Sequence, residues 1–181
     1  MDLALIAEHK KICSFRLVAC PAAFCKTEVS YQQFLEHILK ECKFSQNIGE
    51  LPYSHTLTFE YEPEKLMGNS LLSWQTATMM WKNKTFLLTI KSNGKMANVC
   101  IQMLGSSDDC LKYRVRLSIL NREGLDVVSH YDHPYSVYIE EDDKVYGGLI
   151  ITTKNLKKAS RPSANNSGKY SFLVHLEFEK I

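Results

Sequence analysis

Four metal-binding side chains fall within one short stretch near the N-terminus. Cys20 and Cys25 are separated by four residues, eleven residues follow, and His37 and Cys42 are again separated by four. A structural Zn²⁺ ion is held in a tetrahedron by four cysteine or histidine side chains, and two close pairs flanking a short helix can supply them. The sequence therefore predicts a Cys₂HisCys zinc finger with Zn²⁺ bound by Cys20, Cys25, His37 and Cys42. The alternative is that the cysteines are buried as small apolar residues and His37 lies on the surface.

A turn and a helix would have to position these ligands. Pro21 follows Cys20 and opens a tight turn that would bring the first pair together. Apolar residues then recur at helical spacing over 31–42, at Tyr31, Phe34, Leu35 and Ile38. On this predicted helix His37 lies about one turn before Cys42, which can turn back from the helix end. Because all four ligands come from the protein, no position stays open for a reactive water, and the predicted finger is structural.

Length and composition fit one small domain joined to one medium domain. The 181 residues include 22 Lys and Arg against 20 Asp and Glu, a net charge of +2, and 45% are hydrophobic, which is typical of a globular protein. Nucleic acid is not expected as a partner, because the predicted helix sets only Lys40 against Glu36 and Glu41. Neither a signal peptide nor a membrane span is indicated, so no membrane partner is expected. Free thiols and a zinc site favour the cytoplasm, and also the nucleus, as the compartment.

The sequence beyond the finger changes to a pattern of period two. We place the finger region at 1–45, treat 43–52 as a linker, and assign 46–181 to a second domain. Alternating apolar residues predict eight short strands, at 54–61, 85–91, 98–104, 111–119, 125–131, 135–140, 147–153 and 171–179. Short strands with turn residues between them and no long helix predict a mainly β fold, an eight-stranded antiparallel β-sandwich.

A basic stretch interrupts the strand pattern between Thr152 and Lys169. It contains no acidic residue, and its cations are Lys154, Lys157, Lys158, Arg161 and Lys169. The core of the stretch, 160–168, is rich in Ser, Asn, Pro and Gly and is predicted to be an exposed loop. Such a loop could contact an acidic partner, or it could simply be a solvated hairpin tip.

A Cys₂HisCys finger followed by this sandwich resembles the seven-in-absentia (Siah) proteins and their TRAF-like relatives. Siah-type modules carry two consecutive fingers. The first ends in His-x₃-Cys, and a Phe-Arg pair then precedes the Cys-Pro that opens the second. The matching residues in this sequence are His9, Cys13, Phe15, Arg16, Cys20 and Pro21.

This resemblance also implies a second, incomplete metal site. His9 and Cys13 would close the first finger, whose two opening cysteines would lie before Met1, as would the RING of the family, and neither is in this sequence. The alternative is that His9 is an exposed histidine and Cys13 a packed cysteine.

The same resemblance implies what the chain does. It would be the substrate-recognition and dimerisation module of a RING-type E3 ubiquitin ligase, a homodimer whose TRAF-like sandwich binds short extended peptides of target proteins for ubiquitination and proteasomal degradation. It would meet a ubiquitin-conjugating enzyme only through the missing RING. By position, the peptide-binding residues would be Leu57, Trp74 and Thr76, although Trp74 could instead be a core anchor. An alternative function is a TRAF-like signalling adaptor or scaffold without a ligase role, and no catalytic motif occurs in the sequence.

Overall fold

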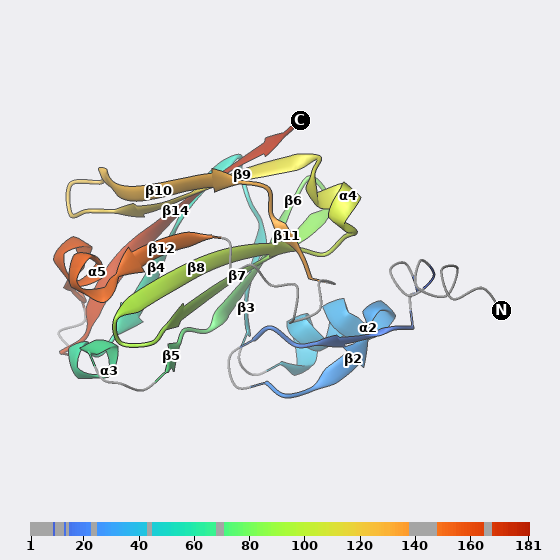
Figure 1. The fold of residues 1–181 in the computed structure, drawn as a ribbon, viewed down its shortest axis with the longest axis horizontal. Helices are drawn as coiled ribbons and strands as arrows, with labels where there is room; N and C mark the ends of the chain where they lie inside the picture. The colour runs from blue at the N-terminus through green and yellow to red at the C-terminus, as the bar shows by residue number, and fades with distance from the viewer. Residues whose placement is uncertain are drawn as a thin grey trace.

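The computed structural model describes residues 9, 13, 15–22, 25–42, 45–67, 71–137, 148–164 and 168–181. The described residues of its N-terminal part form a small unit of two strands and one helix, which lies to one side of the larger sheets (Figure 1). β1 (Leu17–Ala19) and β2 (Glu28–Ser30) pair antiparallel, and helix α2 (Tyr31–Glu36) follows β2 directly. The helix continues as a π-helical turn, η1 (His37–Glu41). The helix predicted over 31–42 is thus confirmed.

The larger part of the chain contains two β-sheets. One has seven strands, in the order β11-β8-β7-β6-β3, with β12 also paired to β8 and β5 to β7. Its strands are β3 (Ser45–Glu50), β5 (Leu72–Ser73), β6 (Thr76–Trp81), β7 (Lys84–Ser92), β8 (Met96–Met103), β11 (Tyr135–Ser136) and β12 (Leu149–Thr152). Two turns join its central strands. Lys82 and Asn83 both have positive φ in the β6–β7 turn, and Gly94 has a φ of 84° in the β7–β8 turn, as tight hairpins require.

The other sheet has five strands arranged around the long C-terminal strand. Its strands are β4 (Ser54–Tyr61), β9 (Tyr113–Leu120), β10 (Asp126–Asp132), β13 (Arg161–Pro162) and β14 (Tyr170–Lys180). β14 pairs with β4 over 170–177 and with β9 over 173–180, and β10 pairs with the far side of β9. Among the described residues, β4 pairs only with β14.

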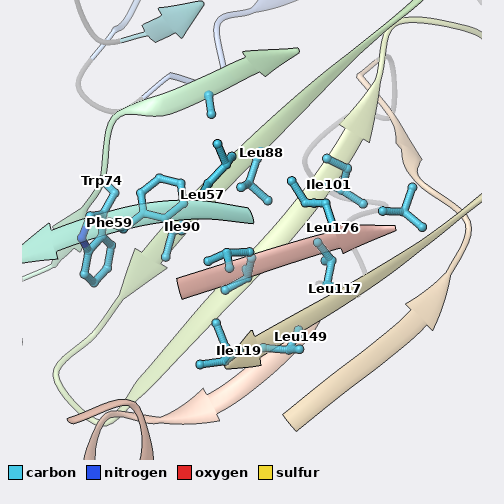
Figure 2. Close-up of a cluster of buried hydrophobic side chains, with 14 of the residues drawn as sticks. Leu57, Phe59, Trp74, Leu88, Ile90, Ile101, Leu117, Ile119, Leu149 and Leu176 are labelled. Atoms are coloured by element: carbon cyan, nitrogen blue, oxygen red, sulfur yellow. The ribbon is translucent and has the colours of Figure 1, made fainter. Parts of the chain in front are cut away.

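The two sheets face each other across one apolar core (Figure 2). Because strand side chains alternate between faces, every second residue points inward, and aromatic rings fill the two ends of the interior. Phe172 lies edge-on to Trp74 with ring centroids 5.5 Å apart, and Phe178 stacks on Trp81 at 5.4 Å. Removing a large apolar side chain from water contributes about 1.5–3 kcal/mol. The prediction of a mainly β protein with packed sheets is confirmed.

The arrangement of strands differs from the prediction in two respects. The sheets have five and seven strands, and the larger sheet is mixed, because β3 runs parallel to β6 and β11 runs parallel to β8. Residues 45–50, predicted as part of a linker, form β3. Their sequence, Ser-Gln-Asn-Ile-Gly-Glu, has no apolar alternation, since this edge strand is held by main-chain pairing.

Three short helices in the described residues were not predicted. They are α3 (Pro63–Met67), α4 (Ser107–Cys110) and α5 (Thr153–Ala159). The exposed loop predicted at 160–168 is confirmed only in part. Arg161, Pro162, Ala164 and Gly168 are exposed, but Ser160 and Ser163 are buried and Arg161–Pro162 forms β13. Residues 138–140, 147 and 165–167, which belong to predicted strands or to this loop, lie outside the described residues. Among the helices in the described part of the chain, none is both long enough and apolar enough to cross a membrane.

Candidate metal centre

The four predicted ligands converge in the small N-terminal unit. One ligand atom from each of Cys20, Cys25, His37 and Cys42 lies within 4.8 Å of all the others. The Sγ atoms of Cys20 and Cys42 are 3.8 Å apart, and Cys25 Sγ lies 3.5 Å from His37 Nε2. A tetrahedral ion with metal–sulfur distances of about 2.3 Å separates its ligand atoms by about 3.8 Å. The spacing therefore fits one metal ion among these four side chains, as the sequence predicted.

A tight turn after β1 presents the first pair of ligands. The main-chain N–H of Cys20 donates to the carbonyl of Thr27 at 3.0 Å, which closes the strand pair above the turn. The N–H of Cys25 donates to the carbonyl of Ala22 at 3.1 Å. These two bonds hold both thiols on the same side of the turn, where they face the helix.

The π-helical turn η1 presents the second pair. In an α-helix, residues five positions apart point away from each other, because each residue turns about 100°. A π-helix has more residues per turn and closes with an i to i+5 hydrogen bond. The N–H of Cys42 donates to the carbonyl of His37 at 2.7 Å, and Cys42 itself has extended backbone angles that end the helix. The wider turn thus brings Cys42 to the same side of the helix as His37. The sequence alone did not predict that this turn is π-helical.

The thiols of the cluster differ in acidity. Burial opposes ionisation of Cys25, but hydrogen bonds from the main chain and side chain of Thr27 and from His37 outweigh it and lower the pKa of Cys25 to about 6. Burial also raises the pKa of Cys20, and the nearby thiols of Cys42 and Cys25 raise it further. A bound cation would stabilise all the thiolates together, so metal binding would release the proton of Cys20.

A carboxylate lies behind the histidine ligand. His37 is buried, and its Nδ1 lies 3.5 Å from Oε2 of Glu41 on the same helical segment. The opposite ring nitrogen, Nε2, faces Cys25. A carboxylate behind a ligating imidazole favours the orientation in which the other nitrogen meets the metal. The sequence analysis did not assign Glu41 this role, although its position four residues after His37 was visible.

The cluster is packed against the outer face of the seven-stranded sheet. Phe34 and Ile38 of the helix lie in one apolar cluster with Cys20 and Cys42. Leu87 of β7 belongs to the same cluster and is fully buried. Its neighbour Leu88 points to the other side of the strand, into the sandwich core. Strand β7 therefore separates the candidate metal site from the sandwich core and contributes a side chain to each.

His9 and Cys13 are not joined to this cluster. His9 is exposed and Cys13 is partly buried. Within the described residues, the group that could hold a metal contains neither of them. Their role as an incomplete second site stays a prediction.

All three predicted peptide-binding residues are buried, Leu57 and Trp74 between the two sheets and Thr76 on the face of its strand opposite to Ala77. Leu57, Trp74 and Thr76 are 8%, 7% and 1% exposed. The indole Nε1 of Trp74 donates to the carbonyl of Glu60 at 2.9 Å, which fixes the ring between the sheets. Trp74 is thus a core anchor, and the three side chains do not form an exposed groove. Their part in peptide binding stays a prediction.

A shallow hollow nevertheless opens beside Trp74. It encloses about 250 Å³ between β4, α3 and the segment that enters β6. Its lining residues include Tyr61, Lys65, Leu72, Gln75 and Lys169, and the sequence analysis assigned none of these five to a peptide site.

Comparison with known proteins adds no relative. No protein-family model matches the sequence, and no curated protein matches it. The resemblance to the Siah family therefore rests on the residues and spacings of the sequence alone.

Proposed function

We propose that this chain is a zinc-stabilised protein-recognition module of the Siah type. It would be the substrate-recognition and dimerisation part of a RING-type E3 ubiquitin ligase, binding short extended peptides of target proteins through a TRAF-like sandwich. The observation that carries the proposal is the convergence of three thiols and one imidazole in a unit packed directly on a two-sheet β-sandwich.

The donor set suits zinc in a structural role. Three cysteines and one histidine are typical ligands of structural Zn²⁺, and four protein ligands close the coordination sphere. When bound, the ion cross-links the turn after β1 to the end of the helix. With the end of the helix fixed in this way, Phe34 and Ile38 stay packed against Leu87. The finger is then held rigidly on the sandwich.

An open sheet edge next to the hollow supports peptide binding. Among the described residues, the edge of β4 away from β14 has no strand partner. Extended peptides bind such edges as an added strand, with main-chain hydrogen bonds for affinity and pockets for selectivity. β4 carries Leu57, and the hollow beside Trp74 begins at its end, at Glu60 and Tyr61. A peptide along β4 could therefore place one side chain in this hollow.

The zinc assignment can be tested by elemental analysis of the purified chain together with its mass in solution. We expect one zinc per chain and the mass of a dimer. Cys42→Ala should lose the zinc, while Cys100→Ala, a matched change in the sandwich, should retain it. Zinc retained after Cys42→Ala, or no zinc in the unmodified chain, would contradict the finger.

Peptide recognition can be tested by selection from a displayed library of random peptides, followed by binding of the selected peptides in solution. We expect a shared extended motif and binding that Gln75→Arg weakens several-fold at the hollow. Gln32→Arg makes the same change on the exposed side of α2 and should have no effect. Failure to enrich any motif, or equal effects of the two changes, would count against the proposal.

A further inference from the structure

We propose that one end of the sandwich, formed by α5, β13 and the start of β14, is a docking surface for a short acidic segment of a partner protein. We name this surface the basic end and define it by Arg122, Lys154, Lys157, Lys158, Arg161 and Lys169. The proposal goes beyond peptide binding at β4 and does not depend on the metal centre.

Helix α5 supplies half of these cations. It lies next to α3 at one end of the molecule (Figure 1). Leu156 and Ala159 are buried beneath the helix, while Lys154, Lys157 and Lys158 are exposed. The side chain of Thr152 caps the helix by accepting from the N–H of Asn155 at 3.2 Å. The buried face and the N-terminal cap therefore fix the helix that carries the three lysines.

The arginines come from two other segments and meet the end of this helix. Ser160 is completely buried, and its hydroxyl donates to the carbonyl of Leu156 at 2.7 Å. Arg122, from the turn between β9 and β10, donates from Nε to the carbonyl of Ser160 at 3.2 Å. Arg161 is the next residue and begins β13. The bond from Nε holds the guanidinium group of Arg122 near the C-terminal end of α5, and the backbone of Arg161 follows that end directly.

Lys169 lies on the same side of the β13–β14 pair as Arg161. Arg161 is paired with Ser171, and the N–H of Ser163 donates to the carbonyl of Lys169 at 2.9 Å. Because strand side chains alternate, residues 161 and 169 share a face of this pair, while Pro162 and Tyr170 share the other. Lys169 also lines a hollow of about 350 Å³ with Pro162, Ser163, Gly168 and Tyr170.

The positive charge of the basic end is not neutralised from within the described chain. None of its six cationic side chains forms an ion pair with a carboxylate of the described residues, whereas Lys40, Lys65, Lys112 and Arg116 each do. Of the nearby carboxylates, Glu62 is paired with Lys65 and Glu60 accepts from the hydroxyl of Ser163. The whole chain carries a net charge of only +2, so this end concentrates its positive charge.

The shape and composition of the basic end favour an acidic peptide over a nucleic acid. A helix of seven residues is about 10 Å long, which matches a few residues of extended peptide. Glu60 and Glu62 line a hollow together with Lys169, and Glu64 lies on α3 next to α5. These carboxylates limit the surface to a short anionic segment and would repel a longer phosphate chain. Stacking of bases would need exposed aromatic rings, but Trp74 is buried and Tyr170 is half-buried.

An anionic lipid surface is also disfavoured. The exposed residues of α5 are all polar, and membrane-surface helices insert apolar side chains on one face. Lysines make up four of the six cations, and their flexible ammonium groups suit the scattered carboxylates of Asp and Glu residues.

The experiment is fluorescence anisotropy of the whole chain with a labelled peptide of alternating Glu and Ser, at low and at physiological ionic strength. We expect saturable binding that weakens with salt and that the double change Lys157→Glu, Lys158→Glu lowers about tenfold. The control Lys82→Glu, Lys180→Glu makes the same change in net charge near the stacked rings of Trp81 and Phe178, and should leave binding unchanged. Lys158→Ala with Arg161→Ala repeats the test without introducing negative charge.

Several outcomes would overturn the proposal. An equal loss of peptide affinity in the Lys157/Lys158 and Lys82/Lys180 variants would mean that binding depends only on the net charge of the chain. Equal binding of a peptide of alternating Gln and Ser would mean that acidity is not recognised. Tighter binding of single-stranded DNA, or of vesicles containing phosphatidylserine, with the same dependence on Lys157 and Lys158 would assign the surface to another class of partner.

Discussion

The finger and the sandwich are held together by different means. The finger has a small apolar cluster around Val18, Phe34 and Ile38, and its four candidate ligands lie close together in the same unit. The sandwich buries a continuous set of aromatic and aliphatic side chains between two sheets. Units of a few tens of residues cannot bury enough apolar surface to fold alone, and a metal ion supplies the missing stabilisation. With zinc bound as proposed, the stability of the finger would depend on four ligand atoms, whereas the stability of the sandwich is spread over many side chains.

The largest effect should come from Cys42→Ala. Loss of one ligand removes the zinc, and structural zinc contributes on the order of 10 kcal/mol to folding of such units. We expect hydrogen exchange, followed by mass spectrometry, to show loss of protection over 17–42 while strands β9 and β14 stay protected. Cys100→Ala is the control. Equal loss of protection in both parts would show that the finger and the sandwich are one cooperative unit.

Phe178→Ala should give the next largest effect, in the opposite region. The ring is fully buried between Trp81 and Phe86, so truncation leaves a cavity and lowers the free energy of unfolding by about 3–5 kcal/mol. Urea denaturation measures the loss, and zinc content should not change. Phe15→Ala removes the same group at a site that is 74% exposed and should cost less than about 0.5 kcal/mol. A large effect of Phe15→Ala would mean that this residue is covered in solution.

Leu87→Ala and Leu88→Ala test the contribution of one strand to the finger and to the sandwich core separately. Both side chains are fully buried, and each truncation should lower stability by about 2–5 kcal/mol. Only Leu87 contacts the finger, so only Leu87→Ala should also speed the transfer of zinc to a chromogenic chelator. Identical rates of zinc transfer in the two variants would show that the contact of Leu87 with the finger does not slow the loss of zinc.

The smallest effect is the pH dependence of zinc binding. The pKa of Cys20 is raised by burial, so below that raised pKa its proton must leave when zinc binds, while Cys25, with a pKa of about 6, is already ionised at pH 7. Lower pH therefore weakens zinc binding, and apparent affinity should rise at least about tenfold per pH unit between pH 6 and 8. Competition with a chelator at several pH values measures this. Affinity that does not change with pH would contradict the acidity assigned to Cys20.

Cysteine reactivity provides a control for this pH dependence in the sandwich. Burial raises the pKa of Cys110 to about 12, with the charge of Asp109 adding to the effect. Alkylation of Cys110 in the folded chain should therefore stay slow across the same pH range. Fast alkylation there would mean that the sandwich opens as readily as the finger.

Local patterns in the sequence determined the ligand set, the helix over 31–42 and most strands. Cys20, Cys25, His37 and Cys42 lie within 23 residues, so chain connectivity alone brings them near each other. The alternation of apolar and polar residues along β9 and β14 predicts which side chains point inward, because strand geometry has a period of two. Both signals depend only on neighbours in sequence, and the structure confirms the proximity of the four side chains and the inward-facing alternation.

Only the tertiary structure decided the remaining features. β3 lacks an apolar pattern and is a strand because β6 offers it main-chain partners from 30 residues away. The burial of Trp74 depends on a second sheet, and the burial of Thr76 depends on what covers the opposite face of its strand, neither of which the sequence places. Five of the six cations of the basic end were visible as one run in the sequence, but only the fold adds Arg122, which reaches the carbonyl of Ser160 from a distant turn. Spacing along the chain specifies local geometry, whereas contacts between distant segments are set only when the whole core packs.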